Sequence, residues 1–203
     1  NMPWIKTIPY AAATGKLKAL YDRVKGPDNN VDNIMMIHGL RPHSMEGHMA
    51  MYKFCLHHTG NTIPKWFLET LGVWVSALND CHYCVEHHFA GLVRLLNDEA
   101  KSAGIRRALD TATPETAPLT PAQIIAMEYA RQLTRDPGGM VEDIVKKLRN
   151  AGWDDGEILE INQVCAYFNY ANRTVLGTGC STDGDILGLS PTKSDEPDNW
   201  GHS

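Results

Sequence analysis

The sequence predicts an all-α fold, and three observations support this. Apolar residues recur every three or four positions through most of the chain, which is the spacing of one face of a helix. The segments with this spacing start and stop at residues that cap helices. No segment shows convincing period-two alternation, the pattern of a half-buried strand. We therefore expect a helical bundle without a β-sheet.

Helix-breaking residues divide the first part of the chain. Gly26-Pro27 ends the first helix, and Arg41-Pro42 separates the second from the third. Pro64 fits the first position of the fourth helix. The expected helices span residues 12–25, 33–39, 42–58 and 64–78.

The third of these helices carries a methionine-rich stripe and a histidine-rich end. We expect His57 and His58 to cap its C-terminus, with Gly60 as the left-handed residue that ends the helix. The stripe is typical of adaptable core and is also suited to lining a pocket for an apolar ligand. It comprises Met45, Met49, Tyr52 and Leu56.

The later helices have clear starts. Thr120 with Gln123, and Asp154 with Glu157, place a capping residue three positions before a Gln or Glu. From Ser181 onward the chain is rich in Gly, Pro, Asp and Ser, which predicts an irregular, loosely attached tail over residues 181–203. Residues 1–180 are expected to form a single domain. The expected helices here span residues 81–96, 98–109, 120–135, 141–150 and 154–177.

Composition and charge limit the kinds of protein and partner that fit this chain. The chain has 203 residues, of which 43% are hydrophobic and 21% charged, enough for one compact core. The formal net charge of −5 and the lack of a basic run argue against nucleic-acid or membrane-surface partners. No apolar stretch is long enough to span a bilayer, and no signal-peptide pattern is seen at the N-terminus. We expect a cytoplasmic protein.

The chain has five cysteines, an odd number that fits a reducing compartment better than a disulfide scaffold. Cys55 and Cys165 fall in apolar helical patterns and are expected in the core. Cys180 follows a glycine-rich break and is expected to be exposed. Only Cys81 and Cys84 have a spacing that implies chemistry.

The segment from Glu69 to residue 96 predicts a thiol redox centre. Asp80 is a suitable N-cap for a helix starting at Cys81, so both thiols would lie in the first turn, where the helix dipole favours thiolates. Cys84 and His88 are four residues apart on one helix face, so the imidazole can act as a base. Glu69 on the preceding helix can orient that imidazole if the two helices pack as a hairpin.

Two other interpretations of the motif stay open. The cysteines could be half of a zinc site with His87 and His88, although no second Cys-x-x-Cys and no finger-type histidine spacing is present. They could also be inert core residues. His82 and His87 lie off the face of Cys84 and are expected at the surface or at a subunit contact. We assign no metal ligands.

The pattern E-x11-C-x-x-C-x-x-x-H, formed by Glu69, Cys81, Cys84 and His88, resembles the active-site signature of AhpD-like alkylhydroperoxidases in the carboxymuconolactone decarboxylase family. The whole chain is most similar to the uncharacterised peroxidase-related branch. The resemblance implies an AhpD-like helical arrangement and homo-oligomers, commonly trimers or hexamers. The chain departs from the founding peroxidases at Tyr83, which replaces a histidine and is a poor base.

The resemblance also implies a mechanism. Cys84 would attack a hydroperoxide with help from His88 and Glu69, Cys81 would resolve the sulfenic acid as a disulfide, and an external dithiol would reduce it. Tyr83 would be an accessory residue. No cofactor is expected beyond the dithiol of Cys81 and Cys84, and local electrostatics alone would favour Cys81 as the attacking thiol.

Other functions use the same residues. The chain could be a thiol–disulfide oxidoreductase acting on a protein disulfide, which needs no peroxide pocket. It could also be a non-enzymatic redox sensor or metal-binding module. Decarboxylation ranks lower, because the dithiol signature belongs to the peroxidase-like members of the family.

Overall fold

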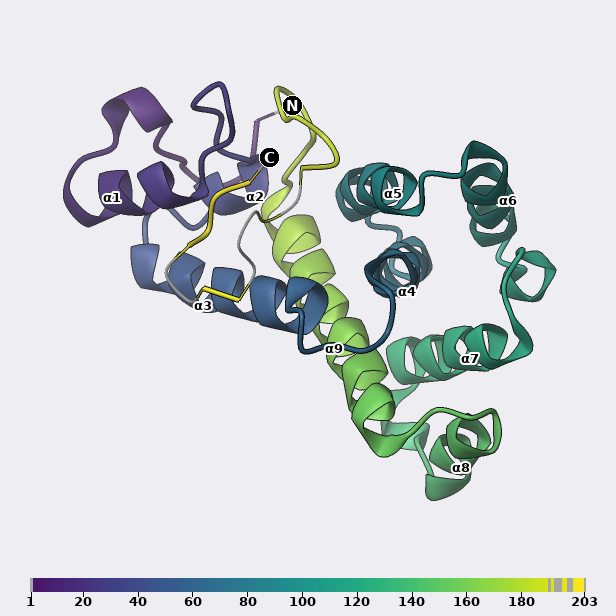
Figure 1. The fold of residues 1–203 in the computed structure, drawn as a ribbon. Coiled ribbons are helices and arrows are strands. Elements are labelled where there is room, and N and C mark those ends of the chain that lie inside the picture. Colours follow the sequence, from purple (N-terminus) through teal and green to yellow (C-terminus); the bar gives the residue numbers. More distant parts are fainter. Residues whose placement is uncertain (1, 190, 192–194, 197–198, 203) are drawn as a thin grey trace.

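The computed structural model describes residues 2–189, 191, 195–196 and 199–202, and the regular structure of this part is helical (Figure 1). Its one β-type pairing is an isolated bridge between Pro191 and His202. The prediction of an all-α fold is confirmed.

The helices before the cysteine motif lie inside the predicted ranges. A π-helical turn, Lys53–His57, continues the third helix and accounts for the longer range expected there. These helices are α1 (Gly15–Val24), α2 (Asn33–Met36), α3 (Pro42–Tyr52) and α4 (Lys65–Leu78).

Two of the later helices start where their predicted capping boxes lie. Thr120 and Asp154 each form a complete capping box, with Gln123 and Glu157 respectively. Gly179, at a φ of 67°, ends the last helix in the left-handed conformation. These helices are α5 (His82–Leu96), α6 (Glu99–Asp110), α7 (Pro121–Arg135), α8 (Glu142–Asn150) and α9 (Asp155–Thr178).

Two predicted caps earlier in the chain are wrong. Gly60 does not have a left-handed backbone, because the π-helical turn ends the preceding helix at His57 without needing that conformation. Pro64 lies just before α4 as its N-cap, with an extended ψ of 134°, and is not its first residue.

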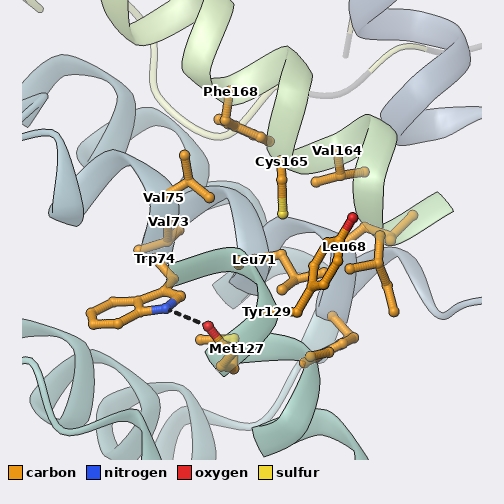
Figure 2. Packing of buried hydrophobic residues seen from close by; sticks show 14 of the residues in the cluster. Leu68, Leu71, Val73, Trp74, Val75, Met127, Tyr129, Val164, Cys165 and Phe168 are labelled. Carbon is orange, nitrogen blue, oxygen red and sulfur yellow. Dashed lines mark hydrogen bonds between the residues drawn. The ribbon is translucent and has the colours of Figure 1, made fainter. Parts of the chain in front are cut away.

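Helix α4 forms the centre of the main core. Nearly all of its residues are buried, because α5, α7 and α9 pack around it. Figure 2 shows Leu71 and Trp74 of α4 among side chains of α7 and α9, and the Trp74 indole N–H donates to the Met127 carbonyl at 3.0 Å. Cys165 lies in this core, where burial raises its pKa to about 12, so its predicted core position is confirmed.

A second apolar cluster joins the two ends of the described chain. Leu20 and Tyr21 of α1 pack with Met45 and Met49 of α3 and with Trp200 near the C-terminus. Figure 1 shows the purple N-terminal segment and the yellow C-terminal segment on the same side of the molecule. No helix in the described ranges is both long and apolar enough to cross a membrane.

The close crossing of α4 and α9 can be tested at Gly72. A Cβ atom there would lie 2.2 Å from the ring of Phe168. We expect Gly72→Ala to lower the free energy of unfolding by about 1–3 kcal/mol, the usual cost of overpacking, measured by urea denaturation. Gly47→Ala is the matched control, since nothing lies within 4 Å of its Cβ position. Equal stability of Gly72→Ala and the unmodified protein would contradict this crossing.

Candidate functional site

The two cysteines are presented by the turn that joins α4 to α5. Asp80 has a left-handed backbone with a φ of 53°, which Asp tolerates better than most residues. The Cys81 N–H donates to the Ser76 carbonyl at 2.9 Å, and Cys81 is the N-cap of α5. The predicted Asp80 cap is therefore wrong, because an N-cap has an extended backbone that the tight turn does not allow at this residue.

Side chains of α9 hold this turn in place. The Asn79 Nδ2 group donates to the side-chain oxygens of Asn169 and Asn172, each at 2.9 Å. Asn172 in turn donates to Ser76 Oγ at 3.0 Å. The cysteine turn is thus fixed from the helix that crosses behind it.

The thiols of Cys81 and Cys84 are in contact. Their Sγ atoms are 2.7 Å apart, longer than a disulfide bond of about 2.05 Å, and both cysteines are free. Cys81 is 0% and Cys84 2% exposed, so reagents larger than a small molecule cannot reach the sulfurs in this conformation. The pair is poised to form a disulfide with little movement.

The thiols of Cys81 and Cys84 differ in pKa because their surroundings differ. The hydrogen bond between them lowers the pKa of Cys81, and the backbone N–H of Cys84 adds to this effect. Burial raises the pKa of Cys84 well above its usual value. Cys81 therefore ionises first, as the dipole argument predicts for the cysteine nearer the start of the helix.

Glu69 and His88 meet across the interface of α4 and α5, as expected for a helical hairpin. His88 Nδ1 lies 2.7 Å from Glu69 Oε2, and the Glu69 side chain is 3% exposed. Because a carboxylate only accepts hydrogen bonds, Nδ1 carries the hydrogen and Nε2 is left to accept a proton. The predicted contact between these residues is confirmed.

Glu69 has a second imidazole neighbour that the sequence did not predict. His57 Nε2 lies 3.6 Å from Glu69 Oε1, and burial lowers the pKa of His57 well below its usual value. The predicted capping role of His57 is wrong, because the π-helical turn ends with this side chain buried beside Glu69. His58 accepts a hydrogen bond from the Gly60 N–H at 2.9 Å, which suits its predicted place at the end of the helix.

A cavity of about 60 Å³ adjoins Cys84, His88 and Glu69. Met49 and Tyr52 of the methionine-rich stripe line it, whereas Met45 and Leu56 are buried in the core. Within the described chain no hydrogen bond joins Cys84 Sγ to His88, and both face this cavity. Cys81 instead borders a different surface depression of about 440 Å³.

Asp185, which follows α9, holds two residues that line the cavity, Tyr83 and His87. Its Oδ2 accepts a hydrogen bond from the Tyr83 hydroxyl at 2.7 Å and lies 3.0 Å from His87 Nε2. The Asn33 N–H donates to both of its oxygens, at 3.0 and 3.2 Å. Burial raises the pKa of Tyr83 well above its usual value, so the phenol is a hydrogen-bond donor and not a base.

His87 and Cys180 differ from their predicted positions. His87 lines the cavity and not the surface, because Asp185 provides a buried partner for it. The alternative place at a subunit contact stays a prediction. Cys180 packs beside the dithiol instead of being exposed, and burial raises its pKa to about 12. His82 is exposed as expected, with its side chain 81% accessible.

Asp32, just before α2, also lines the cavity. Its Oδ1 is buried without a hydrogen-bond partner, and its side chain does not cap α2 although it occupies the N-cap position. Burial raises the pKa of Asp32 to about 6, with a further increase from Asp185 and opposing effects from His87 and His88. No motif in the sequence pointed to Asp32 or Asp185.

The described residues of the C-terminal segment contact the site, in contrast to the expected loose attachment. Leu189 and His202 line the cavity, and His202 stacks on Tyr52 with ring centroids 5.8 Å apart. The buried Lys53 ammonium donates to the backbone carbonyls of Glu196 and Asn199. The segment is irregular, but it forms part of the cavity wall.

No protein-family model and no curated protein matches this chain. Among solved structures, it is similar to an alkylhydroperoxidase AhpD core protein, an uncharacterised peroxidase-related protein from Ralstonia eutropha JMP134, with a TM-score of 0.77 and 20% identity over 93% of this chain and 97% of that chain. It is also similar to an uncharacterised peroxidase-related protein from Silicibacter sp. TM1040, with a TM-score of 0.67 and 26% identity over 76% and 78% of the two chains.

A third similar structure is the debrominase Bmp8 in complex with 2,3,4-tribromopyrrole, with a TM-score of 0.62 and 14% identity over 83% of this chain and 84% of that chain. The chain therefore has the AhpD-like fold, and its structural neighbours are consistent with the AhpD-like family that the cysteine motif resembles.

Proposed function

We propose that this chain is a dithiol peroxidase that reduces small organic hydroperoxides or hydrogen peroxide. The observation that carries the proposal is that Cys84 shares one small cavity with the pair of His88 and Glu69. The peroxidase-related structural neighbours support the same class of reaction.

The reaction would proceed in two steps. His88 Nε2 takes the proton of the Cys84 thiol, and the thiolate attacks the terminal oxygen of the hydroperoxide. An S–O bond forms, the O–O bond breaks, and the remaining oxygen leaves as an alcohol or water after gaining a proton. The Cys81 thiolate then attacks Cys84 Sγ, the S–S bond forms, and the hydroxyl leaves as water with the proton held by His88.

Glu69 would act as the positioning residue for His88. Its hydrogen bond fixes the imidazole tautomer and stabilises the imidazolium that forms when Cys84 is deprotonated. An external dithiol would then reduce the disulfide of Cys81 and Cys84, and no cofactor or metal enters the scheme. The family resemblance supports a homo-oligomer, a trimer or hexamer, which the molar mass in solution tests.

The alternative hypothesis, a thiol–disulfide oxidoreductase, is less well supported. Exchange with a protein disulfide requires a sulfur that another protein can reach, and Cys81 and Cys84 are 0% and 2% exposed. A small hydroperoxide needs only the cavity.

The assignment of the attacking thiol can be tested with single cysteine variants. We expect Cys81→Ser to retain a sulfenic acid on residue 84 after one equivalent of hydrogen peroxide, because the resolving thiol is missing. Trapping with a sulfenic acid probe and peptide mapping checks this. Sulfenic acid found on residue 81 in Cys84→Ser, and none on residue 84 in Cys81→Ser, would reverse the assignment.

The positioning role of Glu69 predicts a slower oxidation of Cys84. We expect Glu69→Gln to lower the second-order rate constant for thiol loss by about 10²-fold, because the neutral amide no longer stabilises the imidazolium. Glu86→Gln, on the outer side of α5 where Glu86 pairs with Arg106 at 2.6 Å, is the control and should react like the unmodified protein. Equal rates for the two variants would exclude Glu69 from the reaction.

The cavity size predicts a preference for small oxidants. A volume of about 60 Å³ is well below the roughly 150 Å³ of an engineered cavity that holds benzene. We expect ethyl hydroperoxide to oxidise the dithiol about 10-fold or more faster than cumene hydroperoxide. Leu189→Ala, which widens the cavity, should reduce the ratio of the ethyl hydroperoxide rate to the cumene hydroperoxide rate. Leu187→Ala, at a 42% exposed position, should leave this ratio unchanged. A ratio near one in the unmodified protein would contradict the small cavity.

A further inference from the structure

In the proposed peroxide reaction, His88 takes the proton of Cys84, and no residue is yet assigned to protonate the leaving oxygen. His88 is occupied by the proton of Cys84 while the O–O bond breaks. An alkoxide is a poor leaving group, so a general acid beside the departing oxygen would accelerate the step. Such an acid must line the same cavity as Cys84 and must carry a proton.

We propose that Asp32 is this general acid, a second catalytic residue that lines the same cavity as Cys84 and His88. The inference rests on the proposed peroxidase function and adds a residue that the cysteine motif does not contain. Asp32 lies 49 or more positions before the two cysteines, and the irregular segment before α2 brings it to the cavity.

The contacts of Asp32 do not fit a structural role. An aspartate at an N-cap normally accepts a hydrogen bond from the first turn of its helix, but Asp32 makes no such bond. Its Oδ1 is buried without a partner. A buried polar atom of this kind usually costs stability unless a ligand or a proton satisfies it.

Asp185 explains why Asp32 has no protein donors. The Tyr83 hydroxyl, His87 and the Asn33 N–H, which surround this part of the cavity, all bond to Asp185. Asp32 is left as the carboxyl group that no donor stabilises in its charged form. Two neighbouring carboxyl groups in different surroundings commonly take different roles, one accepting hydrogen bonds and one carrying a proton.

Electrostatics support the protonated form of Asp32. Burial is the main reason that its pKa rises to about 6. The titratable groups that interact with it are His87, His88, Asp185, Tyr52, Tyr83 and Cys180. The carboxyl group thus holds a proton in a fraction of molecules near neutral pH and in most of them below pH 6. This is the range in which a general acid works efficiently.

The proton inventory balances with Asp32 in this role. The Asp32 carboxyl O–H gives its proton to the leaving oxygen, while Cys84 is oxidised to a sulfenic acid and the peroxide is reduced to an alcohol or water. His88 later gives the proton of Cys84 to the water that leaves in the second step. The proton of the Cys81 thiol returns to solvent, from which Asp32 is protonated again.

The test compares two oxidants that differ in leaving group. Ethyl hydroperoxide releases an alkoxide that needs a proton, whereas peracetic acid releases acetate, which does not. The pre-reduced full chain is mixed with each oxidant and quenched by alkylation, and oxidation at Cys84 is followed by mass spectrometry. Asp32→Asn is compared with Asp28→Asn, which removes the same charge from an exposed position in the same loop.

We expect Asp32→Asn to react about 10²-fold more slowly with ethyl hydroperoxide and within about threefold of the unmodified protein with peracetic acid. Asp28→Asn should match the unmodified protein with both oxidants. In the unmodified protein, the rate with ethyl hydroperoxide divided by the rate with peracetic acid should fall as the pH rises through about 6. In Asp32→Asn this ratio should not change with pH. Forming the ratio cancels the ionisation of Cys84, which affects both oxidants.

Three results would overturn the inference. Unchanged rates for Asp32→Asn with both oxidants would exclude Asp32 while leaving the peroxidase proposal intact. An equal loss with both oxidants would assign Asp32 a structural role instead of proton donation. No oxidation of Cys84 by either oxidant in the unmodified protein would remove the proposed function itself, and the inference with it.

Discussion

The hydrogen bond between Glu69 and His88 is the interaction on which the site depends. Its carboxylate belongs to α4, a helix whose other side chains are mostly apolar and buried. Removing one partner of such a buried pair typically costs about 3–5 kcal/mol, so the register of α4 against α5 is strongly constrained. The same bond fixes the His88 tautomer, which links the packing of the helices to the chemistry of the thiols.

The remainder of the cavity depends on segments without regular structure. Asp185 lies 152 positions from Asn33, yet it accepts two hydrogen bonds from that residue and also contacts Tyr83 and His87 of α5. Leu189 and His202 close the same space. The C-terminal segment therefore completes the cavity wall, and the size of the substrate that can reach Cys84 is set largely outside the cysteine motif.

Local rules explain which features the sequence could predict. Capping boxes and helical spacing are properties of neighbouring residues, so the helices were found to within a few positions. The sequence predicts the pairing of Glu69 with His88, because a buried carboxylate in an apolar helix needs a partner and His88 is the nearest candidate. His57, Asp32 and Asp185 carry no such signal. Their positions follow from a π-helical turn and two irregular segments, whose paths depend on tertiary contacts. His87 was misplaced for the same reason, since its partner Asp185 lies 98 positions away.

Acidity alone would make Cys81 the attacking thiol, because its pKa is lowered and that of Cys84 is raised. Thiolate nucleophilicity falls as the pKa falls, so the Cys84 thiolate is the stronger nucleophile once His88 has removed its proton. The lower pKa of Cys81 helps at two other points. It supplies a thiolate to attack the sulfenic acid, and it makes Cys81 the better leaving group when an external dithiol opens the disulfide at Cys84. The difference between the two thiols thus suits both halves of the proposed cycle, provided that His88 and not Cys81 accepts the proton of Cys84.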